Sequence, residues 1–472
     1  MPVAAAAVAA GLATGPGSGV TRFAKSTAAS VTPVRPGKTH ALSPLDNAME
    51  RHTVHVVLYC RAAPGLGREQ LKESLSEVLS LYPAMTGRLT RGEGGGEGAV
   101  AAAAAAEGEP ARRGWVVKCN DAGVRMVDAR AAPTLDEWLA TATGDEEMDL
   151  LYYEPMGAEP YIWSPFYVQL TEFADKSYAL GLSCTHIHND PTAAALFFQA
   201  WAAAHRRTTS TYPPFLHAPA LEVSPSSPPP APPLLADKSR AASPASTDAA
   251  AAMSSATFHF PAPAVRALLS SLEPGATPFA ALAALFWLRI TGAADGGGDG
   301  ERELTLALDF RKRMHAPLPW GYYGSVVHFT RAHADLASGL PGVAAALDAH
   351  VAGVPEEELW RAVEWLHARQ QEHGAAGAFQ MYGPELTCVA LDHVPMYGAE
   401  FEAGAPPARV SCRVGGAAGE GLVVVLPAAE GGDARDVVVT LPAEATARVC
   451  RDGEVLRHGG QVVFGPKAGK EA

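Results

Sequence analysis

Apolar runs and helical patterns follow one another along the first half of the chain. Residues 54–60 (VHVVLYC) form a continuous apolar run, which is typical of a buried strand. Residues 71–89 then carry leucines at helical spacing. Two further apolar runs, 167–173 and 178–187, flank a short polar stretch, as the strands of a hairpin do. The pattern predicts a domain that contains both strands and amphipathic helices.

The second half shows the same mixture of elements, without a repeat of fixed period. Residues 277–293 (TPFAALAALFWLRITGA) predict an almost wholly apolar, buried helix, and residues 304–314 predict a strand that leads into basic residues. Residues 207–256, between the halves, are rich in Pro, Ser and Ala, a composition that favours an extended linker. We therefore expect an α/β chain with a disordered tail over 1–20, an N-terminal domain over 21–206, a crossover linker over 207–256 and a C-terminal domain over 257–472.

The composition is globular with an acidic balance. Of the 472 residues, 48% are hydrophobic and 18% are charged, and the length exceeds the ~250 to 300 residues at which a single core stops growing. Lys and Arg total 37 against 50 Asp and Glu, a net charge of −13, and no basic stripe occurs, so we expect no nucleic-acid partner. The chain has no run of ~18 apolar residues, so we expect no membrane span.

The densest group of reactive side chains lies in residues 183–198 (SCTHIHNDPTAAALFF). His186, His188 and Asp190 match the start of a zinc-hydrolase ligand set, which needs three or four ligands in all. Pro191 stands where such a set continues with another histidine. We therefore expect no metal at this motif.

The same stretch also fits the start of a helix. Asn189 or Asp190 can cap the N-terminus, and Pro191 suits the first helical position, where no N–H is needed. Capping explains Asp190 but not His186, which ends a strand where a general base would be placed. The residues alone leave open whether His186 is a base or a core histidine. We interpret His188 as a bystander.

The spacing His186-x-x-x-Asp190, with collinear segments over nearly the entire chain, resembles the plant BAHD acyltransferase family. The other matching segments are 42–46 (LSPLD), 116–129 (VVKCNDAGVRMVDA), 163–173 (WSPFYVQLTEF), 278–292 (PFAALAALFWLRITG), 421–427 (GLVVVLP) and 436–442 (DVVVTLP). The resemblance implies two chloramphenicol-acetyltransferase-like α/β domains with mixed sheets, joined by a long crossover loop. It also implies a channel between the domains, which acyl-CoA enters from one side and the acceptor from the other.

The resemblance also implies roles for individual residues. The position of His186 takes the proton of an acceptor hydroxyl or amine as that group attacks the thioester. The position of Asp190 points away and pairs with an arginine, best matched here by Arg311 in LDFRKR, so that Asp190 is structural. No bound cofactor is implied, and acyl-CoA is a substrate.

Departures from the family pattern point to one of its branches. The second family motif, DFGWG, is replaced by Glu400, Phe401, Glu402, Ala403 and Gly404, so that its aspartate and tryptophan are lost. The asparagine expected after Tyr-x-Gly is Ser325. A chain that keeps His186 and drops the second motif resembles the ECERIFERUM and glossy wax proteins.

That branch implies a role in lipid elongation. Its members promote the last rounds of very-long-chain acyl-CoA elongation with the elongase condensing enzyme, a 3-ketoacyl-CoA synthase, and so supply cuticular wax. We accordingly expect a monomer held by this partner at the cytosolic face of the endoplasmic reticulum, and otherwise cytoplasmic. The alternative is an acyl-CoA-dependent O- or N-acyltransferase with His186 as its general base.

Overall fold

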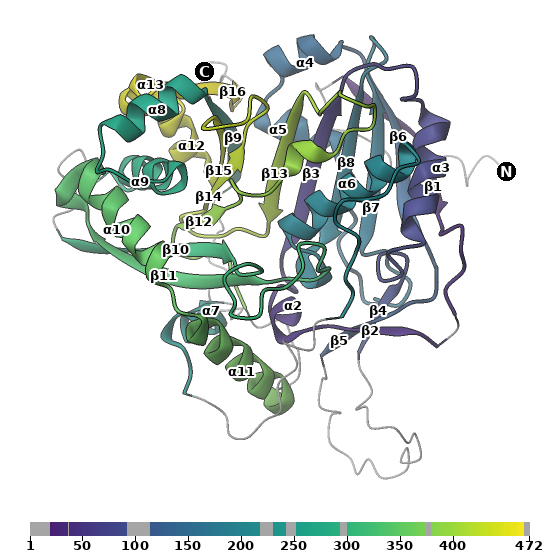
Figure 1. The fold of residues 1–472 in the computed structure, drawn as a ribbon, viewed down its shortest axis with the longest axis horizontal. Coiled ribbons are helices and arrows are strands. Elements are labelled where there is room, and N and C mark those ends of the chain that lie inside the picture. The colour runs from purple at the N-terminus through teal and green to yellow at the C-terminus, as the bar shows by residue number, and fades with distance from the viewer. Residues whose placement is uncertain are drawn as a thin grey trace.

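The computed structural model describes residues 19–35, 37–91, 114–217, 230–241, 252–292, 300–373 and 379–466. Two mixed β-sheets lie side by side, each covered by helices (Figure 1). The first sheet is built mainly from the N-terminal half, and the second from the C-terminal half. The expected α/β architecture with two domains is therefore confirmed. None of the described helices is both long and apolar enough to cross a membrane.

The first sheet has six strands in the order β1-β6-β7-β8-β3-β13, in which only β6 and β7 run parallel. Its strands are β1 (Val20–Ala28), β3 (Thr53–Cys60), β6 (Val124–Ala131), β7 (Phe166–Glu172), β8 (Tyr178–Thr185) and β13 (Arg409–Gly415). A small sheet with the order β2-β5-β4 is made of β2 (Thr39–Ala41), β4 (Arg88–Arg91) and β5 (Trp115–Lys118). The associated helices and 3-10 turns are α2 (Pro44–Ala48), α3 (Arg68–Leu79), α4 (Leu135–Thr141), α5 (Gly144–Glu147), η1 (Met148–Leu150), η2 (His186–His188) and α6 (Pro191–His205).

The second sheet has seven strands in the order β11-β10-β12-β14-β15-β9-β16, with β10, β12 and β14 parallel. They are β9 (Met253–Phe260), β10 (Glu301–Asp309), β11 (Val327–Asp335), β12 (Thr387–Ala390), β14 (Leu422–Pro427), β15 (Arg435–Pro442) and β16 (Gln461–Phe464). The accompanying helices and turns are α8 (Ala262–Ser270), α9 (Pro278–Ile290), η6 (Leu336–Ser338), α10 (Gly339–Gly353), α11 (Glu356–His373), η7 (Met396–Gly398), α12 (Ala443–Val449) and α13 (Gly453–Arg457). The apolar helix that the sequence predicts is α9, and nearly all its side chains are buried.

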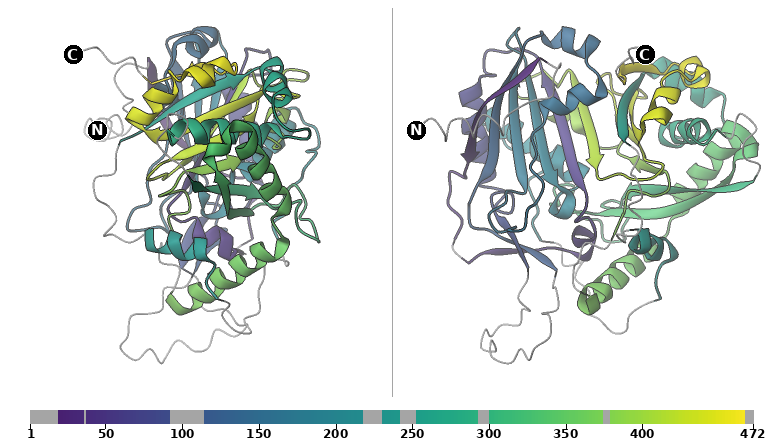
Figure 2. Two further views of the ribbon diagram at one scale, coloured as in Figure 1. Left: turned by 90° about the vertical axis from the view of Figure 1, so that its left-hand side faces the viewer. Right: turned by 180° about the vertical axis from the view of Figure 1, so that it is seen from behind.

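The boundary expected at residue 257 does not separate the two sheets completely. Strand β13 comes late in the sequence but pairs antiparallel with β3 in the first sheet, with Val410 opposite Leu58 and Arg413 opposite His55. Figures 1 and 2 show this yellow-green strand beside the purple β3. Without it, β3 would be an open edge with unpaired backbone groups. The C-terminal half thus completes the N-terminal sheet.

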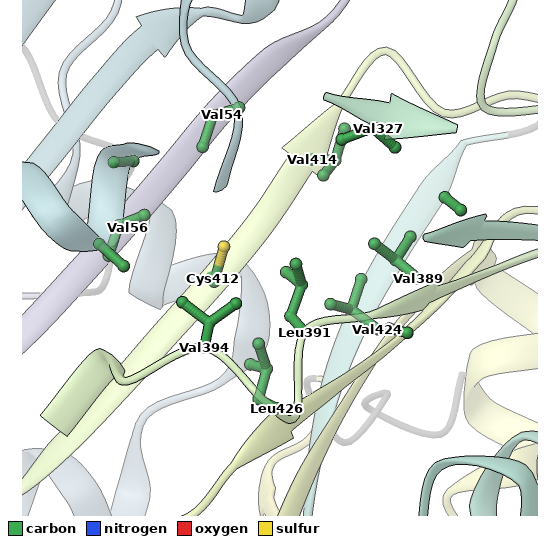
Figure 3. Packing of buried hydrophobic residues seen from close by; sticks show 14 of the residues in the cluster. Val54, Val56, Val327, Val389, Leu391, Val394, Cys412, Val414, Val424 and Leu426 are labelled. Atoms are coloured by element: carbon green, nitrogen blue, oxygen red, sulfur yellow. The ribbon is translucent and has the colours of Figure 1, made fainter. Parts of the chain in front are cut away.

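Apolar side chains fill the space between the two sheets. Figure 3 shows Cys412 of β13 near Leu391 and Val394, and Val414 of the same strand beside Val327 of the second sheet. All of them are buried in one hydrophobic cluster that runs through both halves of the molecule. The sheets therefore share a core, and burial of this apolar surface holds them together.

The crossover linker contains a helix, where the sequence predicts an extended chain. Helix α7 (Pro233–Ala241) lies beside α11 (Figure 1), and β9 begins at Met253, inside the expected linker. Residues 218–229 and 242–251 of the linker lie outside the described residues, as do residues 1–18 of the expected tail. Val20, which was assigned to the tail, begins β1.

A buried carboxylate ties β13 to its neighbours. Glu147, at the end of α5, accepts hydrogen bonds from the hydroxyls of Tyr59 at 2.7 Å and Ser411 at 3.0 Å. Nε of Arg413 on β13 donates to the same carboxylate at 3.1 Å. The side chain of Glu147 has no exposed surface and that of Arg413 very little. Strands β3 and β13 and helix α5 therefore meet at an ion pair closed to water.

Replacing Glu147 by alanine should leave the Arg413 guanidinium buried without a counter-charge. We expect Glu147→Ala to lower the free energy of unfolding by about 3 to 5 kcal/mol, measured by urea denaturation. The matched control is Asp433→Ala, which removes an exposed ion pair with Arg266 and should cost much less. Equal losses in the two variants would contradict the importance of the buried pair.

Candidate functional site

A short turn places His186 at the end of β8. The strand ends at Thr185, residues 186–188 form the 3-10 turn η2, and α6 begins at Pro191. Asp190 is the N-cap, because its Oδ1 accepts a hydrogen bond of 2.8 Å from the N–H of Ala193. The predicted helix start is confirmed, with Asp190 rather than Asn189 as the cap.

The structure brings Asp190 and Arg311 together in a buried, bidentate ion pair. Nη1 and Nη2 of Arg311 donate to the two carboxylate oxygens of Asp190 at 2.8 and 2.9 Å. Nη1 also contacts Asp309 at 3.0 Å. Burial acts to lower the pKa of Arg311, but the two carboxylates outweigh it and raise the pKa above its ordinary value. The guanidinium therefore stays charged in the core.

This cluster joins the two halves of the chain. Oδ2 of Asp190, on the N-terminal side, accepts a hydrogen bond of 3.1 Å from the N–H of Val326. The N–H of the adjacent Ser325 donates to Asp46 at 2.7 Å. Burial raises the pKa of Asp46 to about 7, although its hydrogen bonds from Ser325 and Ser43 act in the other direction. Asp46 closes the LSPLD segment, to which sequence reasoning gave no role.

The imidazole of His186 is closed off from solvent. Its side chain is 0% exposed, and Nε2 lies 3.1 Å from the hydroxyl oxygen of Tyr382. Tyr382 is itself buried and packs edge-on against the rings of His52 and Phe329, with centroid distances of 4.9 and 5.1 Å. Nδ1 of His186 has no hydrogen-bond partner among the described residues. The expected channel therefore does not reach His186 in this structure.

The hydrogen bond between His186 and Tyr382 joins two neutral groups. Burial lowers the pKa of His186, although Asp190 and the residue's own carbonyl group act to raise it. Burial also raises the pKa of Tyr382. At neutral pH the imidazole and the phenol are both uncharged. A neutral imidazole is the form that a general base needs, but its Nε2 is occupied.

His52 positions both partners of this contact. Its carbonyl oxygen accepts a hydrogen bond of 2.8 Å from the N–H of His186. Its Nε2 accepts one of 3.1 Å from the N–H of Met381, next to Tyr382. Because Nε2 accepts, the proton must be on Nδ1, which faces the carbonyl oxygen of Gly415 at 3.3 Å. Burial, with a smaller effect of His186, lowers the pKa of His52 to about 3, so the ring is neutral.

His188 is closed in the same manner by a different tyrosine. Its Nδ1 lies 3.1 Å from the hydroxyl oxygen of Tyr323, and the ring of Phe166 packs against it with a centroid distance of 5.0 Å. Burial lowers the pKa of His188 to about 3. His186 and His188 thus face separate tyrosines. Among the described residues, no three His, Cys, Asp or Glu side chains are grouped as ligands of a metal ion.

The segment that replaces the second motif packs beside the end of α6. The ring of Phe401 contacts Trp201 and His205, with centroid distances of 5.2 and 5.5 Å. The N–H of Gly404, which has a φ of +72°, donates to the Glu400 carboxylate at 3.0 Å. Part of this segment lines a cavity of about 450 Å³ between α3 and α6. The hydrogen bonds and ring contacts of His186 go to Tyr382 and His52 instead.

Sequence reasoning missed Tyr382, although this residue contacts the motif that the reasoning singled out. The stretch QMYGPEL has no periodicity that distinguishes Tyr382 from other aromatic residues. Only long-range packing brings it to His186, which lies 196 positions earlier in the chain. The sequence offered no signal for this contact.

Two relatives of known name cover most of the chain at low identity, and a third covers less than half of it. A hydroxycinnamoyltransferase from Narcissus pseudonarcissus is 27% identical over 88% of this chain and 95% of its own length. Protein ECERIFERUM 2 from Arabidopsis thaliana is 25% identical over 92% of this chain and 97% of its own. Protein ECERIFERUM 26-like from the same plant is 33% identical, over 41% of this chain and 43% of its own.

Solved structures share the fold. Vinorine synthase has a TM-score of 0.68 at 18% identity, over 93% of this chain and 98% of its own. TRI101 of F. graminearum, solved in complex with ethyl coenzyme A, has a TM-score of 0.66 at 14% identity, over 90% of this chain and 99% of its own. At these identities the likeness establishes the architecture and supports the expected fold class.

A family model described as the transferase family matches residues 25–456. The match includes both sheets, η2 with His186, and the pair of Asp190 and Arg311. The chain therefore belongs to this transferase family, the BAHD acyltransferases.

Proposed function

We propose that this BAHD-family protein promotes very-long-chain acyl-CoA elongation together with the elongase condensing enzyme, in cuticular wax biosynthesis. The observation that carries the proposal is the closure of His186 by Tyr382. The site of action follows from the partner, which would hold the protein at the cytosolic face of the endoplasmic reticulum.

The closure argues against ordinary acyl transfer. A general base must come within about 3 Å of the proton that it removes, either directly or through one water molecule. The Tyr382 hydroxyl already occupies that position, and buried rings surround it. An acceptor alcohol or amine would have to displace Tyr382 before the reaction could start. A role that does not use His186 needs no such displacement.

Two further observations support the accessory role. The second motif has lost the aspartate and tryptophan of the family pattern, and Phe401 packs into the side of α6 instead. Relatives named ECERIFERUM match this chain, one of them over nearly its whole length. The resemblance of the sequence to that branch implies work with a condensing enzyme.

Co-expression with a plant 3-ketoacyl-CoA synthase in yeast tests this role. We expect longer acyl chains with the wild type and also with His186→Gln, because a closed imidazole takes no part in the chemistry. Gas chromatography of the fatty acids measures chain length. Glutamine keeps a polar group of similar size near Tyr382, and His188→Gln is the matched control at a second buried histidine.

The outcomes test separately whether the protein promotes elongation and whether His186 takes part in it. If the acyl chains do not become longer although an immunoblot detects the wild-type protein, the proposed elongation role is wrong. Longer chains with wild type and His188→Gln, but not with equally abundant His186→Gln, would show that His186 takes part after all.

The second candidate is an acyl-CoA-dependent O- or N-acyltransferase with His186 as its base. The neutral imidazole and the pair of Asp190 and Arg311 favour it. So does the hydroxycinnamoyltransferase relative, which matches over 88% of this chain. Acyl-CoA would then be a substrate, as in the family at large.

Purified protein distinguishes this candidate. Because Nε2 is occupied, we expect CoA release from a panel of acyl-CoA donors and hydroxyl or amine acceptors to be no faster with wild type than with His186→Gln. A wild-type rate about 100-fold or more above that of the variant, the usual contribution of a general base, would establish the transferase.

We also propose that Asp190 and Arg311 serve architecture rather than chemistry. Arg311→Met would leave the buried carboxylates of Asp190 and Asp309 without their cation, and should lower the free energy of unfolding by about 3 to 5 kcal/mol. Asp190→Asn keeps a helix cap and one acceptor, and should cost less, about 1 to 3 kcal/mol. Urea denaturation measures both. Wild-type stability in both variants, with function lost, would contradict a structural role.

A further inference from the structure

The segment that closes His186 is also held by the crossover linker. We call residues 380–385 the closing segment, since they carry Tyr382 into contact with His186. Several residues of the main body hold it. The N–H groups of Ala418 and Glu420 donate to the carbonyl oxygens of Tyr382 and Pro384 at 3.2 and 2.8 Å, and the Thr305 hydroxyl donates to the Glu385 carboxylate at 2.7 Å. His52 accepts the hydrogen bond from Met381, and the carbonyl oxygen of Gly416 accepts one of 2.6 Å from the Gln380 amide. A further support comes from α7, in a stretch where the sequence predicts an extended linker.

Lys238 of α7 makes that further support. Its side chain is 0% exposed, and Nζ donates to the carbonyl oxygen of Gly383 at 2.7 Å. The same Nζ lies 2.7 Å from the carboxylate of Glu385, and the carbonyl oxygen of Lys238 accepts a hydrogen bond of 3.1 Å from the N–H of Gln380. Both ends of the closing segment therefore bind one residue of the linker helix. Charged hydrogen bonds of a buried ammonium group are among the stronger polar contacts in a protein.

Helix α7 is not packed into a continuous core on all sides. A cavity of about 580 Å³ lies between α7, β11 and α11, and its walls include Leu234, Leu235 and Phe329. Phe329 is also the ring that packs against Tyr382. The ring of Phe329 thus contacts both the cavity beside α7 and the closing segment. Movement of α7 would find room in this cavity, and it would withdraw Lys238 from Gly383.

We infer that α7 is a latch: Lys238 holds the closing segment so that Tyr382 covers His186, and release of α7 opens the way to the imidazole. Lys238 is then a positioning residue that acts through Tyr382. This inference does not depend on the elongation role, because it concerns access to His186 and can be measured on the purified protein alone.

Reaction with diethyl pyrocarbonate, which modifies accessible neutral histidines, tests the latch. Mass spectrometry of peptides and their fragments reports His186 and His188 separately. In wild type we expect both to be protected. In Lys238→Met, which keeps the apolar stem and loses the donor, we expect His186 to react at least about tenfold faster while His188 stays protected. Ser239→Ala, the neighbouring change on α7, should leave both histidines protected.

Tyr382→Ala supplies the second variant, because it removes the closing side chain and leaves Lys238 in place. It should expose His186 and not His188. Continued protection of His186 in Lys238→Met would overturn the latch and leave closure to the supports from the main body, among them His52 and Gly416. A parallel rise in the reaction of His188 would mean general loosening of the fold, and equal exposure of His186 in Ser239→Ala would mean that the exposure is not caused by loss of the Lys238 contacts. Either result would also overturn the inference.

Discussion

The charge of Arg311, buried with its counter-ions, is the constraint around which both halves of this protein are arranged. The guanidinium contacts Asp190 at the start of α6 and Asp309 at the end of β10, and it donates to the carbonyl oxygen of Gly324 at 2.8 Å. Taking a charge out of water is tolerable only if its partners are all in place. The start of α6, the end of β10 and the segment before β11 must therefore assemble together, and η2 with His186 is positioned as a consequence.

Positioning of the imidazole and access to it are separate properties here. The cluster around Arg311 sets where His186 lies, whereas Tyr382, from the other half of the chain, sets what can reach it. A substrate can favour an open state only to the extent that it binds that state more tightly than the closed one. The binding free energy of an acceptor would have to offset the loss of the ring packing around Tyr382 and of the hydrogen bond between Tyr382 and His186. The same fold can thus keep a transferase motif in a closed form.

Local sequence patterns predicted several of the elements because burial of one face of an element produces a periodic pattern of apolar residues. The apolar run before Cys60, the buried helix α9 and the cap at Asp190 all carry their signal within a few residues. The contact of Tyr382 with His186 produces no such pattern, since it depends on how two sheets pack. The pairing of β13 with β3 was missed for the same reason, because an apolar run does not identify the strand with which it pairs. In α7, Leu234, Leu235 and Lys238 lie on one helical face, but the surrounding Pro and Ser residues masked that pattern.

The shared architecture also limits how His186 could be reached. Moving the two halves apart would break the ladder between β3 and β13 and separate Asp190 from Arg311. If β13 instead stayed paired with β3, the ion pair of 2.9 Å between Arg409 on β13 and Asp436 on β15 would break. Either movement would therefore break contacts that are buried or nearly so. Movement of residues 380–385 breaks only the contacts of this one segment and leaves both sheets in place. Access to the imidazole of His186 therefore depends on this short segment, whereas the relative position of the sheets is fixed by the fold.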